Sequence, residues 1–231
     1  MITEFFTNSV FFGVLVSLTG YEIGLYLKKK TRLAVLNPLL ISILFVIGIL
    51  LAFHIDYDVY KNGATYLSYL LTPATVCLAV PLYKQIHLLK QYGAAIGIAV
   101  LAGTVTSLLG ILVLSILFRL DHSMYITLLP KSITTAIGMG ISEENGGIVN
   151  ITVAVIIVTG VFGNVTGEWI LKRFHIEDRI ARGLALGTSA HAIGTSKAIE
   201  LGEIEGAMSS LAIVTAGILT VLGASIFSNF Y

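Results

Sequence analysis

The chain has 231 residues, of which 56% are hydrophobic and only 12% are charged, about half the charged share of roughly 25% typical of soluble domains. This composition, with a mean hydropathy of +0.91, excludes a soluble core of this size. The formal net charge of +1 provides no basic field for nucleic acid, so the expected partner is the lipid bilayer. A single cysteine, Cys77, excludes an internal disulfide and is expected to be a small buried residue.

Apolar runs divide the chain into predicted membrane elements. A spanning helix needs about 20 apolar residues, and five runs predict full spans: Ser9–Leu27, Leu33–Phe53, Gly93–Phe118, Ile148–Leu171 and Ala207–Phe227. Three further runs are apolar but interrupted by polar or helix-weakening residues: Ala64–Tyr83, Tyr125–Ile141 and Gly183–Leu201. No linker or low-complexity tract separates these elements, so we predict a single integral membrane domain over residues 1–231.

The positions of Lys and Arg predict the orientation of these elements. Basic loops at 28–32, 83–90 and 171–182 are expected on the cytoplasmic side, which places the N-terminus outside. If Tyr125–Ile141 crossed the membrane completely, the basic loop at 171–182 would lie outside, against this rule. We therefore predict that Tyr125–Ile141 re-enters from the outside and that Gly183–Leu201 re-enters from the inside.

Two re-entrant elements from opposite faces are typical of transporters built from inverted repeats. A shift of 57 residues lays 72–82 on 129–139, and a shift of 59 lays Glu144, Gly147 and Val155 on Glu203, Gly206 and Val214. Chance similarity is high between apolar segments, so a common origin of these segments stays open. The expected fold is all-α: a polytopic transmembrane helical bundle with broken or re-entrant helices and inverted repeats.

The strongest local signal is the segment 187–202, GTSAHAIGTSKAIELG. Gly187 and Gly194 favour a helix break, and backbone that unwinds inside a bilayer must be satisfied by protein or by a cavity. His191 and Lys197 add titratable groups at membrane depth, which indicates anion binding with His191 as a proton carrier. The alternative is that Lys197 simply pairs with Glu200 near the interface. The candidate substrate-binding hydroxyls here are Thr188, Ser189 and Thr195.

The second signal is the segment 128–140, LLPKSITTAIGMG. Pro130 interrupts the apolar run, and a half-helix beginning there would direct its free N–H groups into the membrane, a natural seat for a carboxylate. Lys131 would reinforce that site. The alternative is an ordinary helix start at Pro130 with Lys131 extending to the outer surface. The candidate hydroxyls that follow are Ser132, Thr134 and Thr135.

The third signal is the segment 69–84, YLLTPATVCLAVPLYK. Pro73 and Pro81 predict a short helix between two breaks, and Thr72 and Thr75 can bond the carbonyls that the prolines free. A proline-kinked structural helix explains these residues about as well as a binding site does.

Enzymatic signatures are missing from the sequence. Ser189 and His191 are two residues apart, which directs them to different sides of a helix, and no G-x-S-x-G elbow is present. The sequence has no Cys, His and Asp cluster with metal-ligand spacing and no phosphate-binding G-x-x-x-x-G-K-[ST] loop. We therefore expect no catalytic residues, no metal and no cofactor.

Over nearly its full length the chain resembles the CidB/LrgB family of membrane proteins. The resemblance is carried by three segments: TPATVCLAVPLYK at 72–84, LLPKSITTAIG at 128–138 and ARGLALGTSAHAIGTSKAIELGEIEGAMSS at 181–210. It implies a bacterial cytoplasmic-membrane protein that works beside a small holin-like protein of the CidA/LrgA type. It supplies no set of catalytic residues, so the candidate site residues above rest on their own chemistry.

The resemblance implies two different activities. One is transport of small carboxylates, because relatives resemble pyruvate carriers and the plastid glycolate/glycerate carrier. The other is a holin-like or antiholin-like pore or interaction protein that modulates murein hydrolase activity with no substrate of its own. The leading hypothesis is movement of a small monocarboxylate, with the elements around Pro130 and Gly187 meeting near the membrane centre and autolysis changing as a consequence. The substrate, the coupling ion and association into a homo-oligomer stay open.

Overall fold

The computed structural model describes residues 11–31, 36–77 and 79–231, and for residues 71, 72, 75, 81 and 82 it describes the backbone only. Every regular element in these ranges is a helix, which confirms the all-α prediction. The helices form two compact units, Met1–Cys77 and Leu78–Tyr231, and each is described by itself. The prediction of a single domain stays a prediction.

The described part of the first unit is held together by a stripe of small residues on helix α2. Gly13, Ser17, Gly20 and Gly24 follow one another at helical spacing, and a side chain at Gly13 or Gly24 would strike the backbone of a neighbouring helix. Small residues allow close helix approach where lipid removes the hydrophobic driving force. The Ser17 hydroxyl also lies 2.9 Å from the Tyr60 hydroxyl. The helices among the described residues of this unit are α2 (Phe12–Thr31), α3 (Pro38–Ala52), α4 (Tyr57–Ser68) and α5 (Leu71–Cys77).

Helix α3 is shorter than the run Leu33–Phe53 predicted as a span. The Asn37 side chain accepts hydrogen bonds from the N–H groups of Leu39, at 2.8 Å, and Leu40, at 3.3 Å, and Pro38 occupies the first helical position. These are the residues that favour a helix start. The described part of the run is therefore a 15-residue apolar helix, and residues 33–35 lie outside the described ranges.

The interrupted run Ala64–Tyr83 is broken in the structure. Helix α4 ends at Ser68, α5 begins at Leu71, and a further helix follows at Ala79. Cys77, which we expected to be buried, is exposed.

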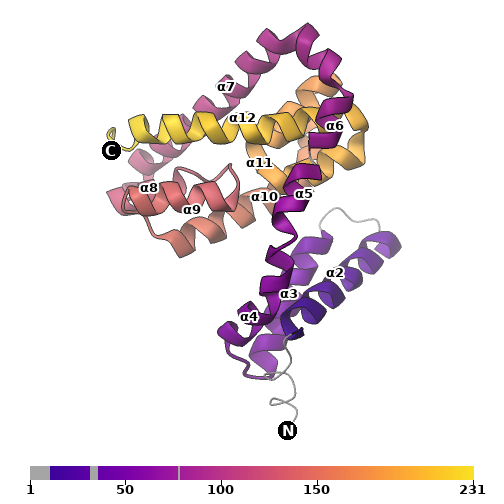
Figure 1. Cartoon of the computed structure of the whole chain (residues 1–231). Coiled ribbons are helices and arrows are strands. Elements are labelled where there is room, and N and C mark those ends of the chain that lie inside the picture. The colour runs from indigo at the N-terminus through magenta and orange to yellow at the C-terminus, as the bar shows by residue number, and fades with distance from the viewer. Residues whose placement is uncertain (1–10, 32–35, 78) are drawn as a thin grey trace. The chain divides into compact units, whose positions relative to one another are not determined.

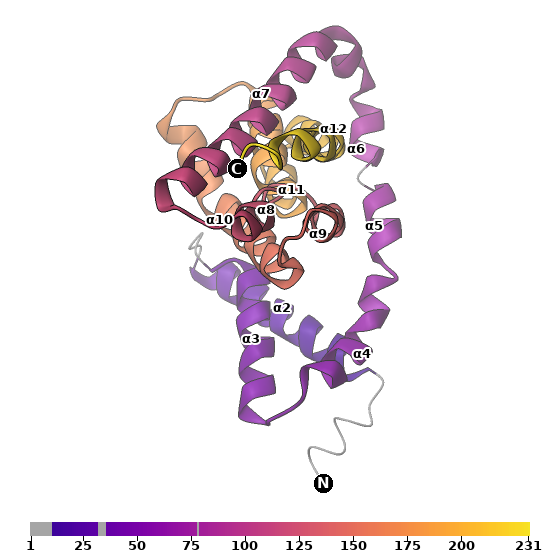
Figure 2. The same cartoon turned by 90° about the vertical axis from the view of Figure 1, so that its left-hand side faces the viewer.

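Among the described residues of the second unit, three helices are long and apolar enough to cross a membrane, α7, α10 and α12. They confirm the spans predicted at 93–118, 148–171 and 207–227. Helix α12 contacts α6, α7, α9 and α11 and so forms the centre of the unit (Figures 1 and 2). The helices are α6 (Ala79–Lys84), α7 (Ile86–Phe118), α8 (His122–Leu128), α9 (Thr135–Glu144), α10 (Val149–Arg173), α11 (Arg179–Leu201) and α12 (Glu203–Phe227).

Helices α8 and α9 form a re-entrant hairpin, hairpin 1 (residues 121–146). Non-helical residues 129–134 separate the two helices. The Ser123 hydroxyl donates to the carbonyl of Gly146 at 3.1 Å, and the Ile148 N–H donates to the Thr127 hydroxyl at 2.8 Å. The chain therefore leaves at the end where it entered, which confirms the re-entrant element predicted at 125–141.

Helix α11 is a second re-entrant hairpin, hairpin 2 (residues 178–201). Its backbone leaves helical geometry at Ala190 and at His191, where φ is 42° and ψ is −134°. A methyl group on Gly194 would collide with the carbonyl of Leu186, eight residues earlier, whereas eight residues of continuous helix span about 12 Å. Leu186 and Ala198 also share a buried cluster. The halves 179–189 and 192–201 therefore lie side by side, as predicted for 183–201.

The two hairpins enter from opposite ends of the unit. At one end, Lys84 lies 3.8 Å from Glu203 at the start of α12, so the basic segments 83–90 and 171–182 flank the base of hairpin 2 there. We call this the basic end. At the other, the far end, the Tyr125 hydroxyl of hairpin 1 donates to the carbonyl of Phe227 at 2.8 Å, where α12 finishes.

Hairpin 1 with α10, and hairpin 2 with α12, form an inverted repeat. A shift of 57 residues relates both hairpin boundaries, from 122 to 179 and from 144 to 201. Asp121 and Asp178 cap equivalent helix starts, accepting from the N–H groups of Met124 at 2.7 Å and Ala181 at 2.8 Å. The spans that follow each contain 25 residues. The repeat thus pairs the two hairpins, and the equivalence of residues 72–82 with 129–139 stays a prediction.

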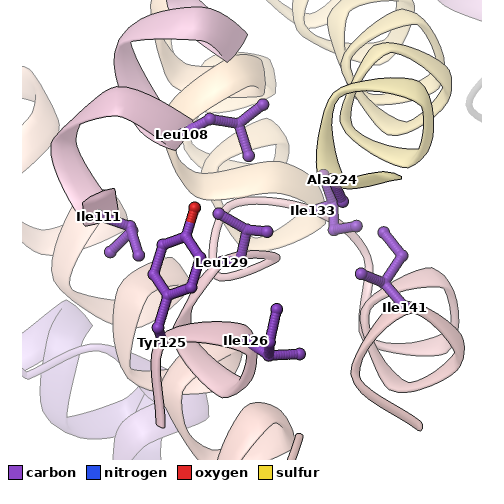
Figure 3. Close-up of a cluster of buried hydrophobic side chains, with 8 residues drawn as sticks. All are labelled: Leu108, Ile111, Tyr125, Ile126, Leu129, Ile133, Ile141 and Ala224. Carbon is purple, nitrogen blue, oxygen red and sulfur yellow. The ribbon is translucent and has the colours of Figure 1, made fainter. Parts of the chain in front are cut away.

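A hydrophobic cluster fixes the base of hairpin 1 at the far end. Figure 3 shows Tyr125 and its neighbours on hairpin 1 packed against side chains of α7 and α12. The same Tyr125 ring lies edge-on to the Tyr231 ring, with 5.5 Å between centroids. The buried members are Leu108, Ile111, Tyr125, Ile126, Leu129, Ile133, Ile141 and Ala224.

Candidate functional site

The tips of the two hairpins meet in the middle of the second unit. On α7, the Ser107 hydroxyl donates to the Ser132 hydroxyl of hairpin 1 at 3.2 Å. One helical turn away, a Cβ on Gly103 would lie 3.1 Å from the Thr188 hydroxyl of hairpin 2. On α10, Ile156 is the shared contact, because its carbonyl lies 3.0 Å from His191 Nε2 and its side chain fills the space beside Gly138.

A cavity of about 610 Å³ lies where these tips approach α7. Four of the candidate residues line it, Lys131 and Ser132 from hairpin 1 and Thr188 and Ser189 from hairpin 2. Most other lining residues are small or apolar, so a few polar groups converge in an otherwise apolar space, as is usual for ligand pockets. The remaining lining residues are Ala99, Ala102, Gly103, Thr106, Ser107, Gly110, Ile111, Leu114, Ala181, Leu184 and Ala185.

Lys131 is the charged group of this cavity. The residue is half-buried, and its ammonium donates to the hydroxyls of Ser132, at 2.7 Å, and Ser107, at 3.3 Å. An ammonium has three N–H donors, so two hydroxyls do not saturate it. In the part of the chain that the structure describes, no carboxylate lies within ion-pair distance of Lys131. An uncompensated charge at membrane depth is costly, so the site favours an anionic ligand.

His191 holds the tip of hairpin 2 and does not line the cavity. Its side chain is 4% exposed and bonds the carbonyl of Ile156. The ring occupies space that only a glycine leaves open, because a Cβ on Gly160 would lie 2.8 Å from it. Thr195 is also outside the cavity, and its hydroxyl lies 2.7 Å from that of Ser209 on α12. Both residues therefore fix hairpin 2 to its neighbouring spans.

Lys197 belongs to an ion-pair network near the basic end. Its ammonium lies 2.6 Å from Glu168 of α10 and 3.4 Å from Glu200. Glu168 also binds Lys172 at 2.8 Å. Lys197 therefore forms ion pairs with two carboxylates and lies outside the cavity.

The other candidates lie around the breaks. Helix α9 begins at Thr135, five residues after Pro130, and Thr134 is its N-cap residue without a side-chain capping bond. In hairpin 2 the break falls at 190–191, and Gly187 lies within the helical half, against the backbone of Ser209. Gly194 lies within the second half of hairpin 2.

The third motif is described only in part. Pro73 and Pro81 each occupy the third position of a helix, α5 and α6, where the missing N–H is tolerated. The side chains of Thr72 and Thr75 lie outside the described part of the chain.

Sequence reasoning missed the contribution of α7. Gly103, Thr106 and Ser107 face the cavity together with Ala99 and Ala102. The signal was the recurrence of small residues at three- and four-residue spacing within a Leu- and Val-rich span. It also missed Glu205, whose side chain is 2% exposed and lies 3.8 Å from Arg182. Over the described ranges no group of three His, Cys, Asp or Glu side chains converges on a metal site.

Comparison with known proteins matches residues 17–230 to the model of the LrgB-like family. The chain is 38% identical over 222 residues to "Antiholin-like protein LrgB" of Bacillus subtilis (strain 168), covering 96% of each chain. It is 36% identical over 225 residues to the protein of the same name from Bacillus cereus (strain B4264), covering 97% of this chain and 98% of that protein. No solved structure gives a significant match. The chain therefore belongs to the LrgB-like family of membrane proteins.

Proposed function

We propose that this protein moves small monocarboxylates, such as pyruvate or glycolate, across the bacterial cytoplasmic membrane, and that this movement is linked to control of autolysis. The observation that carries the proposal is the cavity to which both hairpin tips contribute, with Lys131 as its one charged lining residue in the described ranges. Ligand sites at the meeting point of broken elements are typical of transporters built from inverted repeats.

The charge of the cavity favours a monoanion. One ammonium balances one carboxylate, whereas a second carboxylate would remain uncompensated in an apolar space, at a cost of several kcal/mol. The hydroxyls of Thr188 and Ser189 donate to the carbonyls of Leu184, at 2.8 Å, and Ala185, at 2.6 Å, so they can accept from a hydroxyl group beside the carboxylate. The Thr106 hydroxyl can donate to an oxo group there. A small hydroxy- or oxo-monocarboxylate therefore matches the cavity better than a dicarboxylate does.

We place the basic end in the cytoplasm, because short loops rich in Lys and Arg stay there. Residues 83–90 and 171–182 both lie at this end. In this orientation hairpin 2 enters from the cytoplasm and hairpin 1 from outside.

Uptake by proteoliposomes tests the proposal. The wild type is expected to take up pyruvate or glycolate saturably, with less competition from a dicarboxylate. Lys131→Ala removes a charge-assisted bond worth about 1.5–3 kcal/mol, so half-saturation should rise by about 10- to 100-fold. Lys90→Ala is the matched control, because Lys90 is exposed on α7 and does not line the cavity. Uptake that is non-saturable and insensitive to Lys131→Ala would refute transport through this cavity.

The names of the relatives favour a second candidate function. They are called antiholin-like, and this points to an interaction protein that works beside a small holin-like partner and modulates murein hydrolase activity with no substrate of its own. The same experiment separates the two functions. An interaction protein gives no saturable uptake, and a pore leaks unrelated solutes equally with and without Lys131.

A further inference from the structure

A pocket of about 190 Å³ lies at the basic end and shares no lining residue with the cavity between the hairpin tips. The last turn of α10, the turn that follows it and the first turn of hairpin 2 form its walls. Pockets for drug-sized ligands measure about 300–1,000 Å³, so this one suits only a compact group. Three of its side chains carry N–H donors, and its lining residues are Leu171, Lys172, His175, Ile176, Glu177 and Arg182.

Hydrogen bonds fix the backbone around this pocket. The His175 N–H donates to the Lys172 carbonyl at 3.2 Å, and the Ile176 N–H donates to the Leu171 carbonyl at 2.9 Å. His175 itself is in the left-handed region, with φ at 54°. These two bonds around a left-handed residue form the Schellman motif that ends many helices. The pocket is therefore shaped before any ligand arrives.

Arg182 is a donor that lacks acceptors. Its Nε is buried and has no hydrogen-bond partner among the described residues. Its Nη1 lies 3.8 Å from Glu205, beyond hydrogen-bond distance, and Arg179 approaches the same carboxylate to 3.9 Å. Buried polar groups without partners are rare and costly. The planar fork of a guanidinium matches the oxygens of a phosphate, so a phosphate in the pocket would supply acceptors that Arg182 lacks.

Lys172 also keeps donors for an anion. Its exposed ammonium lies 2.8 Å from Glu168, which Lys197 approaches to 2.6 Å. Two ammonium groups thus share one carboxylate, and Lys172 has three N–H donors in all. Among the described residues that line the pocket, Glu177 is the one carboxylate, and it is exposed. Two positive side chains against one negative side chain make the pocket favour an anion, and Glu177 weakens that preference.

Exposed aromatic residues place the pocket at the level of the lipid head groups. Trp169 of α10 is 66% exposed, and Phe174, directly after α10, is 70% exposed. Aromatic side chains at the end of a membrane span sit at head-group level. Lys172 and His175 lie within one helical turn of them in the sequence. Lipid phosphates are therefore within reach, and basic pockets between membrane helices at this level bind lipid head groups.

We propose that this pocket binds the phosphate of an anionic phospholipid. Arg182, His175 and Lys172 donate to the phosphate oxygens, and the acyl chains lie along the exposed side chains of Trp169 and Phe174. The bound lipid joins the end of α10 to the base of hairpin 2. A zwitterionic lipid fits less well, because its head group carries a cation that the pocket repels. The proposal does not depend on what the protein transports.

Lipid titration of the whole chain in a neutral detergent tests the proposal. Native mass spectrometry measures how much phosphatidylglycerol stays bound, with phosphatidylcholine as the zwitterionic comparison, and phosphatidylglycerol is expected to bind more tightly. Arg182→Gln removes charge-assisted bonds and should weaken phosphatidylglycerol binding by about 10- to 100-fold. This variant also takes a positive partner from the buried Glu205, so variants of exposed residues decide the test if it does not fold.

Two exposed residues of the pocket are expected to act in opposite directions. Lys172→Gln should weaken phosphatidylglycerol binding about fivefold, and Glu177→Gln should tighten it about fivefold. Arg173→Gln and Glu203→Gln are the matched controls, because both residues are exposed at the basic end and neither lines the pocket. Each control makes the same change in net charge as its partner variant and should leave binding unchanged.

The outcomes separate the pocket from general surface charge. Opposite shifts in the two pocket variants, absent from both controls, would support the proposal. Equal effects in pocket and control variants would overturn it. Displacement of phosphatidylglycerol by an equal concentration of inorganic phosphate would overturn the lipid as the occupant. None of these measurements involves uptake of a carboxylate, so failure of the proposed transport would leave them unchanged.

Discussion

Replacing Gly194 by alanine tests the fold of hairpin 2, because the fold determines whether the substitution raises or lowers the free energy of unfolding. In a continuous exposed helix, Gly→Ala stabilises by about 0.5–1 kcal/mol. In this structure the added methyl would collide with the Leu186 carbonyl and lie 2.7 Å from the Ala190 Cβ. The carbonyl is backbone and cannot rotate away, so overpacking of about 1–3 kcal/mol or more is expected instead.

Gly97→Ala is the matched control. Gly97 is exposed on α7, and a Cβ there would meet nothing within 4 Å. At about 2–4 °C per kcal/mol for a chain of this size, the midpoint of thermal unfolding in detergent should fall by about 2–12 °C for Gly194→Ala and stay level or rise for Gly97→Ala. If both variants are stabilised alike, the two halves of α11 do not fold back on each other.

Two pairs of polar residues give further predictions. Glu168→Gln leaves the partly buried Lys197 with a weaker partner, since their 2.6 Å ion pair is lost, and should cost about 1–2 kcal/mol. Lys197→Met added to Glu168→Gln should recover part of the lost midpoint of thermal unfolding. A further fall in that midpoint would contradict the ion pair between Glu168 and Lys197. Thr195→Val leaves the buried Ser209 hydroxyl without its 2.7 Å partner and should cost about 1–3 kcal/mol, measured by the same thermal assay. The double variant with Ser209→Ala should be more stable than Thr195→Val alone, and additive losses would show that the two hydroxyls act independently.

The re-entrant elements could be predicted because the charge of the loops constrains the number of crossings. The basic loop at 171–182 must share a side with the loop at 83–90, and only an element at 125–141 that returns to its own side allows this. The structure places both loops at the same end of the second unit. Asn37 and Pro38 favour a helix start at Pro38, where the structure places it. The apolar run that surrounds them instead predicted one longer span.

The break in hairpin 2 could not be located from sequence. Gly187 and Gly194 are the residues with the greatest backbone freedom, yet the chain turns at Ala190 and His191. The turn is set by tertiary contacts, because the His191 ring fits beside Gly160 of α10 and bonds the Ile156 carbonyl. The glycines serve close helix packing instead.

Four lining residues of the candidate site followed from residue chemistry, Lys131, Ser132, Thr188 and Ser189, and the other lining residues depended on the fold. Lys131 could be predicted because placing an ammonium beside a proline within an apolar run is energetically costly, which indicates a functional role. Gly103 and Ser107 of α7 resemble ordinary small residues of a membrane span, and only the approach of both hairpin tips makes them part of the cavity.

The central claim is that both hairpin tips build one site for a small monocarboxylate. Ser132→Cys and Ser189→Cys, each in a Cys77→Ser background, place one thiol on either hairpin tip and in the same cavity. The rate of their modification by a small methanethiosulfonate reagent can be measured against the concentration of pyruvate or glycolate. If both tips form one site, the carboxylate should protect both thiols from modification, and the carboxylate concentration that gives half-maximal protection should be the same for each. After Lys131→Ala that concentration should be higher for both thiols. Protection of one thiol alone, or of neither, would contradict it.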